Sequence, residues 1–256
     1  MKIKKYIAEF LGTFFLVATV IGSGIMGDNL SSGNVAVALL GNTIATGAIL
    51  YVIIKSFEDL SGAHFNPIVS IVFYFLKEIN LKDLLFYLVI QFIAGIFAVI
   101  LIHFIFELSL LQISSKPRMG ISMVFSEIIA SLGLILTILM VRKNNKSNVA
   151  ISVALFITAG YWFTSSTSFA NPAVTLARTF TDTFTGISPE SIIYFFSGQL
   201  IGLFIALYIY KFLRWENRRK YYFSALEILV DRKWLKVLQK NLLLFRLIQL
   251  ALENLI

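Results

Sequence analysis

Apolar residues fall into long runs separated by short polar stretches. Two shorter apolar runs, about 66–76 and 171–181, each open with Asn-Pro. A helix that spans a bilayer needs about 20 mainly apolar residues, so the short runs cannot cross it and the long runs can. The pattern predicts an all-α membrane protein with two short helices that enter the membrane and return. The six predicted spanning helices lie at about 6–26, 35–55, 83–106, 121–142, 148–165 and 190–212.

The composition indicates that lipid is the solvent for most of the protein surface. Apolar types make up 58% of the 256 residues and charged types 14%, whereas a soluble domain carries roughly 25% charged residues. The chain has no cysteine, which excludes disulfides, cysteine-based zinc sites and a thiol nucleophile. The sequence contains no recognisable pair of nucleophile and base and no cofactor motif. We therefore expect neither an enzyme nor a bound cofactor or metal.

The net charge of +8 could indicate nucleic-acid binding, but the positions of the basic residues favour a membrane. If the N-terminus is cytoplasmic and six helices span, nineteen of the 22 lysines and arginines lie on the cytoplasmic side. Such a bias is typical of the cytoplasmic side of membrane proteins. The distribution predicts a multi-pass protein of the plasma membrane with both termini in the cytoplasm, in contact with lipid and not with nucleic acid.

The two halves of the chain repeat the same order of features. Each half has a first span with a glutamate, Glu9 or Glu127, and a last span with a glutamine, Gln91 or Gln199. An Asn-Pro segment lies between them in each half. Three spans separate corresponding points, so the halves enter the membrane from opposite sides, as in an inverted repeat. The two predicted repeats are residues 1–108 and 119–212.

Each Asn-Pro motif predicts the start of a helix. Proline suits the first helical turn, where its missing N–H would have no partner. Asn66-Pro67 follows the second span and Asn171-Pro172 follows the fifth, so both helix starts should lie near the middle of the membrane. Non-helical backbone at that depth is tolerated only inside protein or along a water-filled cavity. The alternative, that Asn-Pro marks an ordinary turn, does not account for two motifs in equivalent places.

Around its Asn-Pro motifs the chain resembles the major intrinsic proteins, the aquaporins and aquaglyceroporins. The resemblance covers about residues 5–212 and departs from the family at Ile68, where alanine is usual. It implies an aquaporin-like fold of six tilted helices and two re-entrant half-helices, a homotetramer, and one pore in each subunit. The segments that carry the resemblance are Ser61-Gly62-Ala63-His64-Phe65-Asn66-Pro67 and Ser168-Phe169-Ala170-Asn171-Pro172-Ala173.

The resemblance also implies roles for individual residues. The two motif asparagines would offer side-chain N–H groups to a passing solute. Glu9 and Glu127 would hold the re-entrant loops by hydrogen bonds, and a role as proton relays is the alternative. The pore-centre motifs would consist of Asn66, Pro67, Ile68, Asn171, Pro172 and Ala173. Backbone carbonyls would line the pore at Gly62, Ala63, His64, Phe65, Thr167, Ser168, Phe169 and Ala170.

Members of this family set their solute size limit at four positions, counted from the two motif asparagines. Here the four hold no aromatic residue, no histidine and no arginine, and Val174 stands where arginine is usual. We expect a wide, mildly polar filter that passes glycerol-like polyols, water, and neutral metalloid or methylated arsenic species. The arsenic species are included because residues 168–178 resemble a prokaryotic subgroup often associated with arsenic resistance. The filter positions are Thr46, Ala159, Ser168 and Val174.

Three other polar sites, two single residues and one pair, each admit two interpretations. Arg178 lies one helical turn past the last filter position, where it is a candidate vestibule residue that favours anionic or acidic solutes. Alternatively, it reaches the lipid headgroups or pairs with Asp182. His64 is a candidate pH gate, or it contributes only its backbone carbonyl. His103 and Glu107, four residues apart, are either interfacial polar residues or two ligands of an incomplete metal site.

Residues 213–256 form a predicted tail beyond the channel domain of residues 1–212. Apolar residues recur in the tail every three or four positions, with lysines and arginines between them. This pattern predicts a basic amphipathic helix. Such a helix lies on a membrane surface, or it binds a partner or braces the tetramer.

The function that the sequence indicates is passive passage of small neutral solutes. A water-selective aquaporin is one alternative. An ion-coupled secondary transporter is another, because carriers also use inverted repeats and broken helices. The predicted pore centre offers two asparagines and lacks the ionisable groups of a coupled carrier, which favours the channel.

Overall fold

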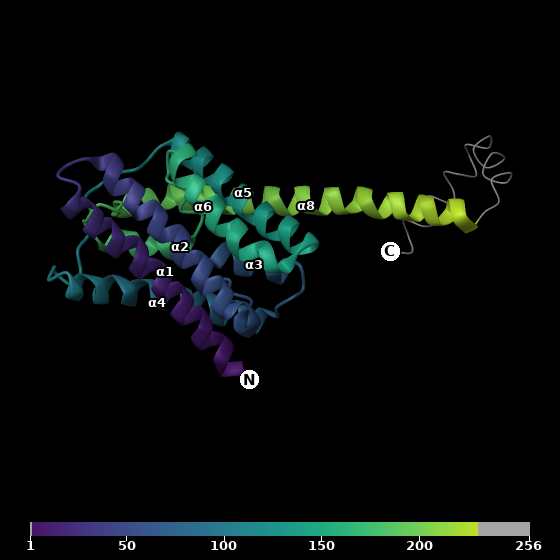
Figure 1. Ribbon diagram of the computed structural model, residues 1–256, viewed down its shortest axis with the longest axis horizontal. Helices are drawn as coiled ribbons and strands as arrows, with labels where there is room; N and C mark the ends of the chain where they lie inside the picture. Colours follow the sequence, from purple (N-terminus) through teal and green to yellow (C-terminus); the bar gives the residue numbers. More distant parts are fainter. Residues whose placement is uncertain (1, 230–256) are drawn as a thin grey trace. The chain divides into compact units, whose positions relative to one another are not determined.

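The computed structural model describes residues 2–229, with side chains for residues 3–214, and within this part the chain is helical and without strands (Figure 1). The predicted all-α fold class is confirmed. The α-helices of this part are α1 (Lys2–Leu30), α2 (Val35–Ser61), α3 (Pro67–Phe75), α4 (Leu81–Ile105), α5 (Ile121–Asn144), α6 (Val149–Phe163), α7 (Pro172–Ala177) and α8 (Ile192–Leu229). Single 3-10 turns are η1 (Lys146–Asn148), η2 (Arg178–Phe180) and η3 (Pro189–Ser191).

The chain divides into two units, Met1–Tyr208 and Ile209–Ile256, and the boundary falls within α8. The first unit holds α1 to α7 and the first part of α8. In the second unit the backbone of α8 continues to Leu229. Most of the predicted amphipathic tail therefore lies outside the described residues, and the predicted domain boundary at residue 212 stays a prediction.

Five of the described helices are long and apolar enough to cross a membrane. They are Ile3–Leu30, Val35–Ser61, Leu81–Ile105, Ile121–Asn144 and Pro189–Arg214. The remaining predicted span is α6, which has 15 residues and so extends about 22 Å at 1.5 Å per residue. It is short because η1 precedes it and Thr164, its C-cap residue, is already extended, with φ −113° and ψ 136°.

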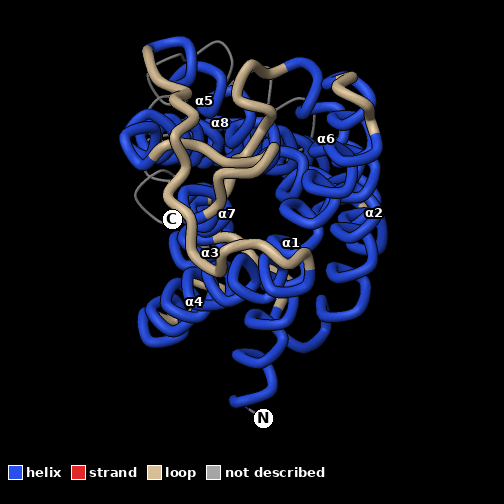
Figure 2. The backbone as a smooth tube through the Cα atoms, turned by 90° about the vertical axis from the view of Figure 1, so that its left-hand side faces the viewer, coloured by secondary structure: helices blue, strands red, loops and turns tan. Residues whose placement is uncertain are grey.

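In each half two helices precede a half-helix and a long helix follows it, as the internal sequence repeat predicts, although α6 is shorter than its counterpart α2. In the first half α1 packs against α2 and α4, and α3 packs against α4. α2 also packs against α6, and α4 packs against α7, so helices of the first half contact helices of the second half directly. Viewed nearly along the helices, the short helices α3 and α7 lie next to each other and beside α4 (Figure 2). This arrangement brings the two Asn-Pro segments together.

Asparagine side chains start several of these helices. Asn34 accepts hydrogen bonds from the N–H groups of Ala36 and Val37 at the start of α2, and Asn80 accepts one from Asp83 N at the start of α4. An asparagine at this position gives a partner to N–H groups that no helical carbonyl reaches. Asn66 and Asn171 occupy the same position before α3 and α7. The polar residue of each Asn-Pro motif is therefore a helix cap as well as a candidate pore residue.

Glycines let α5 and α8 approach each other closely. A methyl group at Gly202 would lie 2.6 Å from the carbonyl oxygen of Ile128, and one at Gly198 would lie 2.4 Å from that of Val124. Backbone groups cannot move away cheaply, so only a residue without Cβ fits. Small residues at helix contacts are typical of membrane proteins, where close packing replaces hydrophobic burial as the force that joins helices.

Substitution of Gly202 by alanine should destabilise the protein by roughly 1–3 kcal/mol, the usual cost of overpacking. Gly41 on α2 is the matched control, because a methyl group there meets no atom within 4 Å, and Gly→Ala in an open helical position stabilises by about 0.5–1 kcal/mol. Thermal unfolding of the purified variants in detergent, followed by tryptophan fluorescence, measures both. Equal melting temperatures for Gly202→Ala and Gly41→Ala would contradict the close contact.

Candidate functional site

The two half-helices start with the same cap. The side-chain oxygen of Asn66 accepts a hydrogen bond from Ile68 N at 3.0 Å. The side-chain oxygen of Asn171 accepts from Ala173 N at 3.0 Å and from Val174 N at 3.3 Å. Because the oxygen is bound to its own helix, each side-chain amide points its NH₂ group away from that helix.

The two NH₂ groups cross-link the two loops. Asn66 Nδ2 donates to the carbonyl oxygen of Ala170 at 2.7 Å, and Asn171 Nδ2 donates to that of Phe65 at 2.9 Å. An amide NH₂ group has two N–H donors. Within the described part of the chain, the second N–H of each asparagine has no recorded partner. Both asparagines line the same cavity, so this second donor is available to a solute.

The backbone before each asparagine has the same unusual conformation. Ala63 and Phe65 have φ of 51° and 50°, and Ser168 and Ala170 have φ of 49° and 45°. These pairs lie three residues and one residue before their asparagines. The left-handed region costs a residue with a side chain about 1–2 kcal/mol, so strong contacts must hold both loops in place.

In the first half, Glu9 holds this strained loop. Its fully buried carboxylate accepts hydrogen bonds from His64 N at 2.9 Å, Phe65 N at 2.7 Å and Gln91 Nε2 at 2.8 Å. The hydroxyl of Ser61 donates to it at 2.7 Å. A buried carboxylate needs such donors. In return, it gives the buried backbone N–H groups of His64 and Phe65 a hydrogen-bond acceptor.

The second half repeats this arrangement residue by residue. The fully buried carboxylate of Glu127 accepts from Phe169 N at 3.0 Å, Ala170 N at 2.9 Å and Gln199 Nε2 at 2.7 Å. The same glutamine nitrogen donates to the hydroxyl of Thr175 at 2.9 Å. The hydrogen bonds that the resemblance implied for both glutamates are thus present in the structure. The contacts do not test the proton-relay alternative, which stays open.

A cavity of about 300 Å³ runs past both asparagines. At one end its lining includes Arg142 and Lys146, and at the other it includes Arg178; we call these the Arg142 end and the Arg178 end. Most of the residues predicted to line the pore with carbonyls do line this cavity, namely Gly62, Ala63, His64, Phe65, Ser168 and Phe169.

Thr167 and Ala170 are not part of the lining, contrary to the prediction. The carbonyl of Ala170 is occupied by Asn66, and the hydroxyl of Thr167 lies 3.4 Å from Arg118 Nη1. The other motif residues, Pro67, Ile68, Pro172 and Ala173, are buried and pack beside the cavity. Ile68 is fully buried and takes part in the packing of the interior.

One of the four predicted filter positions is wrong. Thr46, Ser168 and Val174 line the cavity, but Ala159 is exposed on the outer face of α6. Tyr161 lines the cavity instead. It continues the series Val149, Val153 and Ile157, which also line the cavity and follow one another every four residues along α6. Positions two residues apart in an α-helix differ by a rotation of about 200°, so the side chains of Ala159 and Tyr161 point to opposite sides of α6. Counting back from Asn171 failed because it assumes a fixed loop length between α6 and the motif.

The filter region is therefore more polar on one wall than the sequence predicted. The hydroxyl of Thr46 donates to Asn42 O at 2.8 Å and lies 3.1 Å from the phenol oxygen of Tyr161. Since the single proton of Thr46 is used, Tyr161 must donate to Thr46, which leaves its oxygen free to accept from a solute. The hydroxyl of Ser168 is fully buried and without a partner in the described structure, and the Ser168 side chain lies against Gly160.

Arg178 is a cavity residue and not a headgroup anchor. It is 5% exposed and lines the cavity, its Nε donates to Thr185 O, and its Cζ lies 3.6 Å from the ring centre of Phe169. The alternative pairing with Asp182 is not found. Asp182 accepts hydrogen bonds from Ser115 N, Ser115 Oγ and Ser114 Oγ. These bonds, chiefly the one from Ser115 N, hold the pKa of the Asp182 carboxyl below its ordinary value.

The two histidines have different surroundings. His64 lines the cavity, its ring stacks on Phe73 with 4.7 Å between centroids, and its Nδ1 lies 3.1 Å from Ser70 Oγ. His103 is fully buried, with Nε2 2.8 Å from Thr181 Oγ1 and Nδ1 3.1 Å from Leu110 O. Both ring nitrogens of His103 are therefore occupied by protein. Residues 2–229 hold no group of three possible metal ligands, which argues against the metal pair with Glu107.

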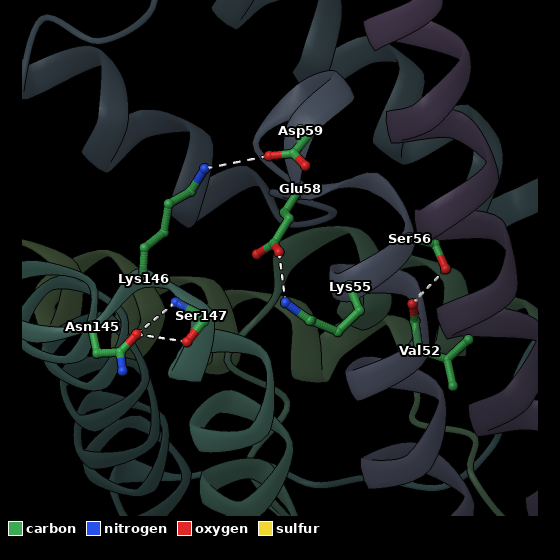
Figure 3. Close-up of polar contacts among 8 residues, drawn as sticks. All are labelled: Val52, Lys55, Ser56, Glu58, Asp59, Asn145, Lys146 and Ser147. Carbon is green, nitrogen blue, oxygen red and sulfur yellow. Dashed lines mark hydrogen bonds and ion pairs between the residues drawn. The ribbon is translucent and has the colours of Figure 1, made fainter.

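Ion pairs surround the Arg142 end of the cavity, and sequence reasoning missed them. Arg142 binds both carboxylate oxygens of Glu78, at 2.8 and 2.6 Å. Lys146 reaches Asp59 at 3.6 Å, as Figure 3 shows beside the ion pair that Glu58 forms with Lys55. The Arg142 pair joins the end of α5 to the α3–α4 loop, and the Lys146 pair joins η1 to the end of α2. The charged groups of these pairs are at least partly exposed to solvent, so the pairs contribute little to stability.

Substitution of Glu9 by glutamine should loosen the first loop. One carboxylate oxygen becomes an NH₂ group, so two of its four donors lose their acceptor, at a cost of roughly 1–3 kcal/mol for each buried donor left unpaired. Glu127→Gln should behave alike, and Glu107→Gln, at an exposed position, is the control. Thermal unfolding in detergent checks the loss of stability. If Glu9→Gln unfolds at the same temperature as Glu107→Gln, the carboxylate does not hold the loop.

Comparisons with known proteins agree with this geometry. The family model "Major intrinsic protein" matches residues 1–161. Aquaglyceroporin AqpS of Rhizobium meliloti (strain 1021) is 46% identical over 210 residues, which are 82% of this chain and 90% of that protein. Aquaporin NIP2-1 of Oryza sativa subsp. japonica is 28% identical over 226 residues, which are 85% of this chain and 73% of that protein.

A solved structure has the same fold. The X-ray structure of the aquaglyceroporin from Plasmodium falciparum matches with a TM-score of 0.61 at 22% sequence identity, covering 82% of this chain and 94% of that one. The family model covers more than half of the chain, and the identity with the rhizobial aquaglyceroporin extends over most of both proteins. This chain belongs to the major intrinsic protein family.

Proposed function

We propose that the protein is a passive membrane channel for small neutral solutes such as glycerol. One observation carries the proposal: two capped half-helices each leave one free asparagine N–H facing a single cavity. A solute oxygen accepts from Asn66 and Asn171 in place of water. The similarity to an aquaglyceroporin over most of the chain supports the same function.

The two half-helices also account for the exclusion of cations. A helix carries partial positive charge at its N-terminus, and α3 and α7 both begin next to an asparagine that lines the cavity. A cation that loses its water there meets two positive helix ends and two N–H donors, which produce an electrostatic barrier. A neutral solute meets no such barrier and moves down its own gradient, so the channel needs no energy source.

The side chains of the filter region determine which solutes fit. Val174 stands where the family usually has arginine, and it contributes neither charge nor donor. Thr46 and Tyr161 supply hydroxyl oxygens to the same cavity lining. This combination favours solutes bulkier than water that have polar and apolar faces. Glycerol-like polyols, neutral metalloid acids and methylated arsenic species are the proposed permeants, and Arg178 is the proposed vestibule residue.

The arrangement in the cell follows from charge and family. We propose a homotetramer in the plasma membrane with both termini in the cytoplasm, because nineteen of the 22 basic residues then face the cytoplasm. In this orientation the Arg142 end opens inward and the Arg178 end opens outward. The large apolar side chains exposed on the long helices, such as Phe97 and Phe204, would face lipid or neighbouring subunits.

The two alternatives make different demands on the pore. A water-selective channel needs a narrow filter, which the valine at position 174 does not favour. An ion-coupled carrier needs ionisable groups at the substrate site. The two buried carboxylates nearest the pore centre, Glu9 and Glu127, are saturated by backbone and glutamine donors. The observed contacts therefore favour the passive channel.

Stopped-flow measurements on proteoliposomes test the function directly. Water, glycerol, urea and larger polyols are applied as osmotic gradients, with empty liposomes as the control. We expect glycerol to enter at a rate that rises linearly with its gradient and does not depend on proton or sodium gradients. Uptake that saturates and requires an ion gradient would establish a carrier, and permeability to water alone would establish the water-selective alternative.

Substitution of Val174 by arginine should narrow the filter and add a second fixed charge near Arg178. We expect glycerol permeability to fall about tenfold, which corresponds to roughly 1.4 kcal/mol of additional barrier, with a smaller fall for water. Val174→Leu adds volume without charge and separates the two effects. An unchanged ratio of glycerol to water permeability in Val174→Arg would show that position 174 does not set the solute size limit.

A further inference from the structure

Two arginines approach the same aromatic ring at the Arg178 end of the cavity. The Cζ atom of Arg178 lies 3.6 Å from the ring centre of Phe169, and that of Arg118 lies 5.5 Å from it. Phe169 is fixed in turn, because it is 5% exposed and its ring centroid lies 4.6 Å from that of Phe195. The two positive charges are therefore held near each other by a rigid ring.

No carboxylate forms an ion pair with either arginine among the residues that the structure describes. The nearest acidic groups have other partners: Asp182 is bound by serines, and Glu127 holds the N–H groups of Phe169 and Ala170. A buried charge without a counter-charge costs free energy unless water or an ion compensates it. The Arg178 end of the cavity thus carries positive potential that the protein itself leaves uncompensated.

The donors of Arg178 are mostly free. A guanidinium has five N–H donors, and the structure records one hydrogen bond from this side chain, from Nε to Thr185 O. The terminal nitrogens have no recorded partner and are not among the fully buried unpaired atoms, so the cavity reaches them. Arg118 uses its terminal nitrogens differently, donating to Ser165 O at 2.7 Å and lying 3.4 Å from Thr167 Oγ1. Arg178 supplies the donors, and Arg118 contributes charge.

We propose that the Arg178 end of the cavity is a binding site for a small oxyanion, which the terminal nitrogens of Arg178 hold through two parallel hydrogen bonds. The planar guanidinium fork matches two oxygens of a carboxylate or phosphate, and the charge of Arg118 strengthens the attraction. A bound ion obstructs the solute path, because Arg178 holds it inside the cavity that a solute must cross. The binding rests on this geometry alone, whereas the obstruction rests on the proposed channel function.

A direct binding measurement tests the site without any transport. Inorganic phosphate is titrated with purified protein in detergent, and the line width of the phosphorus NMR signal is followed. We expect saturable broadening with the natural chain, at least tenfold weaker binding by Arg178→Gln, and unchanged binding by Lys116→Gln. Lys116 is the matched control, since it is an exposed cation of the neighbouring loop that lies outside the cavity. Equal binding by Arg178→Gln and the natural chain would overturn the site.

A second variant separates the hydrogen-bonding fork from the charge. Arg178→Lys keeps the positive charge but cannot bind two oxygens in parallel, so we expect affinity between those of the natural chain and Arg178→Gln. It also keeps the test usable if Arg178→Gln fails to fold. Affinity equal to that of the natural chain would overturn the two-bond assignment.

A transport measurement then tests the obstruction. Glycerol entry into proteoliposomes is measured with external phosphate in place of chloride, at constant osmolarity and ionic strength. We expect phosphate to slow glycerol entry with a midpoint equal to the measured dissociation constant, and to leave Arg178→Gln unaffected. Saturable binding without any slowing would overturn the obstruction. Absence of glycerol entry without phosphate would instead refute the proposed channel function and leave the binding result standing.

Discussion

The structure depends on the burial of two carboxylates that hold strained backbone. Each loop before a motif asparagine turns through left-handed residues, and that asparagine lines the cavity. The same turn aims two consecutive N–H groups of each loop into the protein, where Glu9 and Glu127 accept them. Without an acceptor these N–H groups would be buried and unpaired. A neutral acceptor would form weaker hydrogen bonds with them than a carboxylate does. The cavity therefore exists because charge is buried beside it.

The inverted repeat satisfies this requirement twice with the same spacing. In each half the left-handed residues stand three and one positions before the asparagine, and the glutamine of the last long helix donates to both the carboxylate and a hydroxyl. The hydroxyls belong to Ser70 and Thr175, each four residues after its asparagine. The asparagines then bind the opposite loop, so neither half can form its part of the pore alone.

Features set by local spacing could be predicted from the sequence, and features set by loop length could not. The half-helix starts at Asn66 and Asn171 and the order of the helices follow from residue types at short, fixed distances. The contacts of Glu9 and Glu127 join residues far apart in the sequence, and only the family resemblance implied them. The filter residue on α6 did not follow, because the loop between that helix and the second motif determines which side chain faces inward. Ala159 fits the count, whereas Tyr161 fits the helical period of the lining. The ion pairs of Arg142 and Lys146 join distant segments and left no signal of their own.

The filter separates two properties that a single arginine would combine. An arginine at position 174 would narrow the pore and make it positive at the same point. Here Val174 brings neither charge nor hydrogen-bond donor to the cavity lining, while Arg178, stacked on Phe169 four residues further along, places a positive charge in the same cavity. The charge repels cations by its field, which acts over several ångströms, and the width is set by contact alone. A channel built in this way can admit a bulky neutral solute and still oppose the entry of cations.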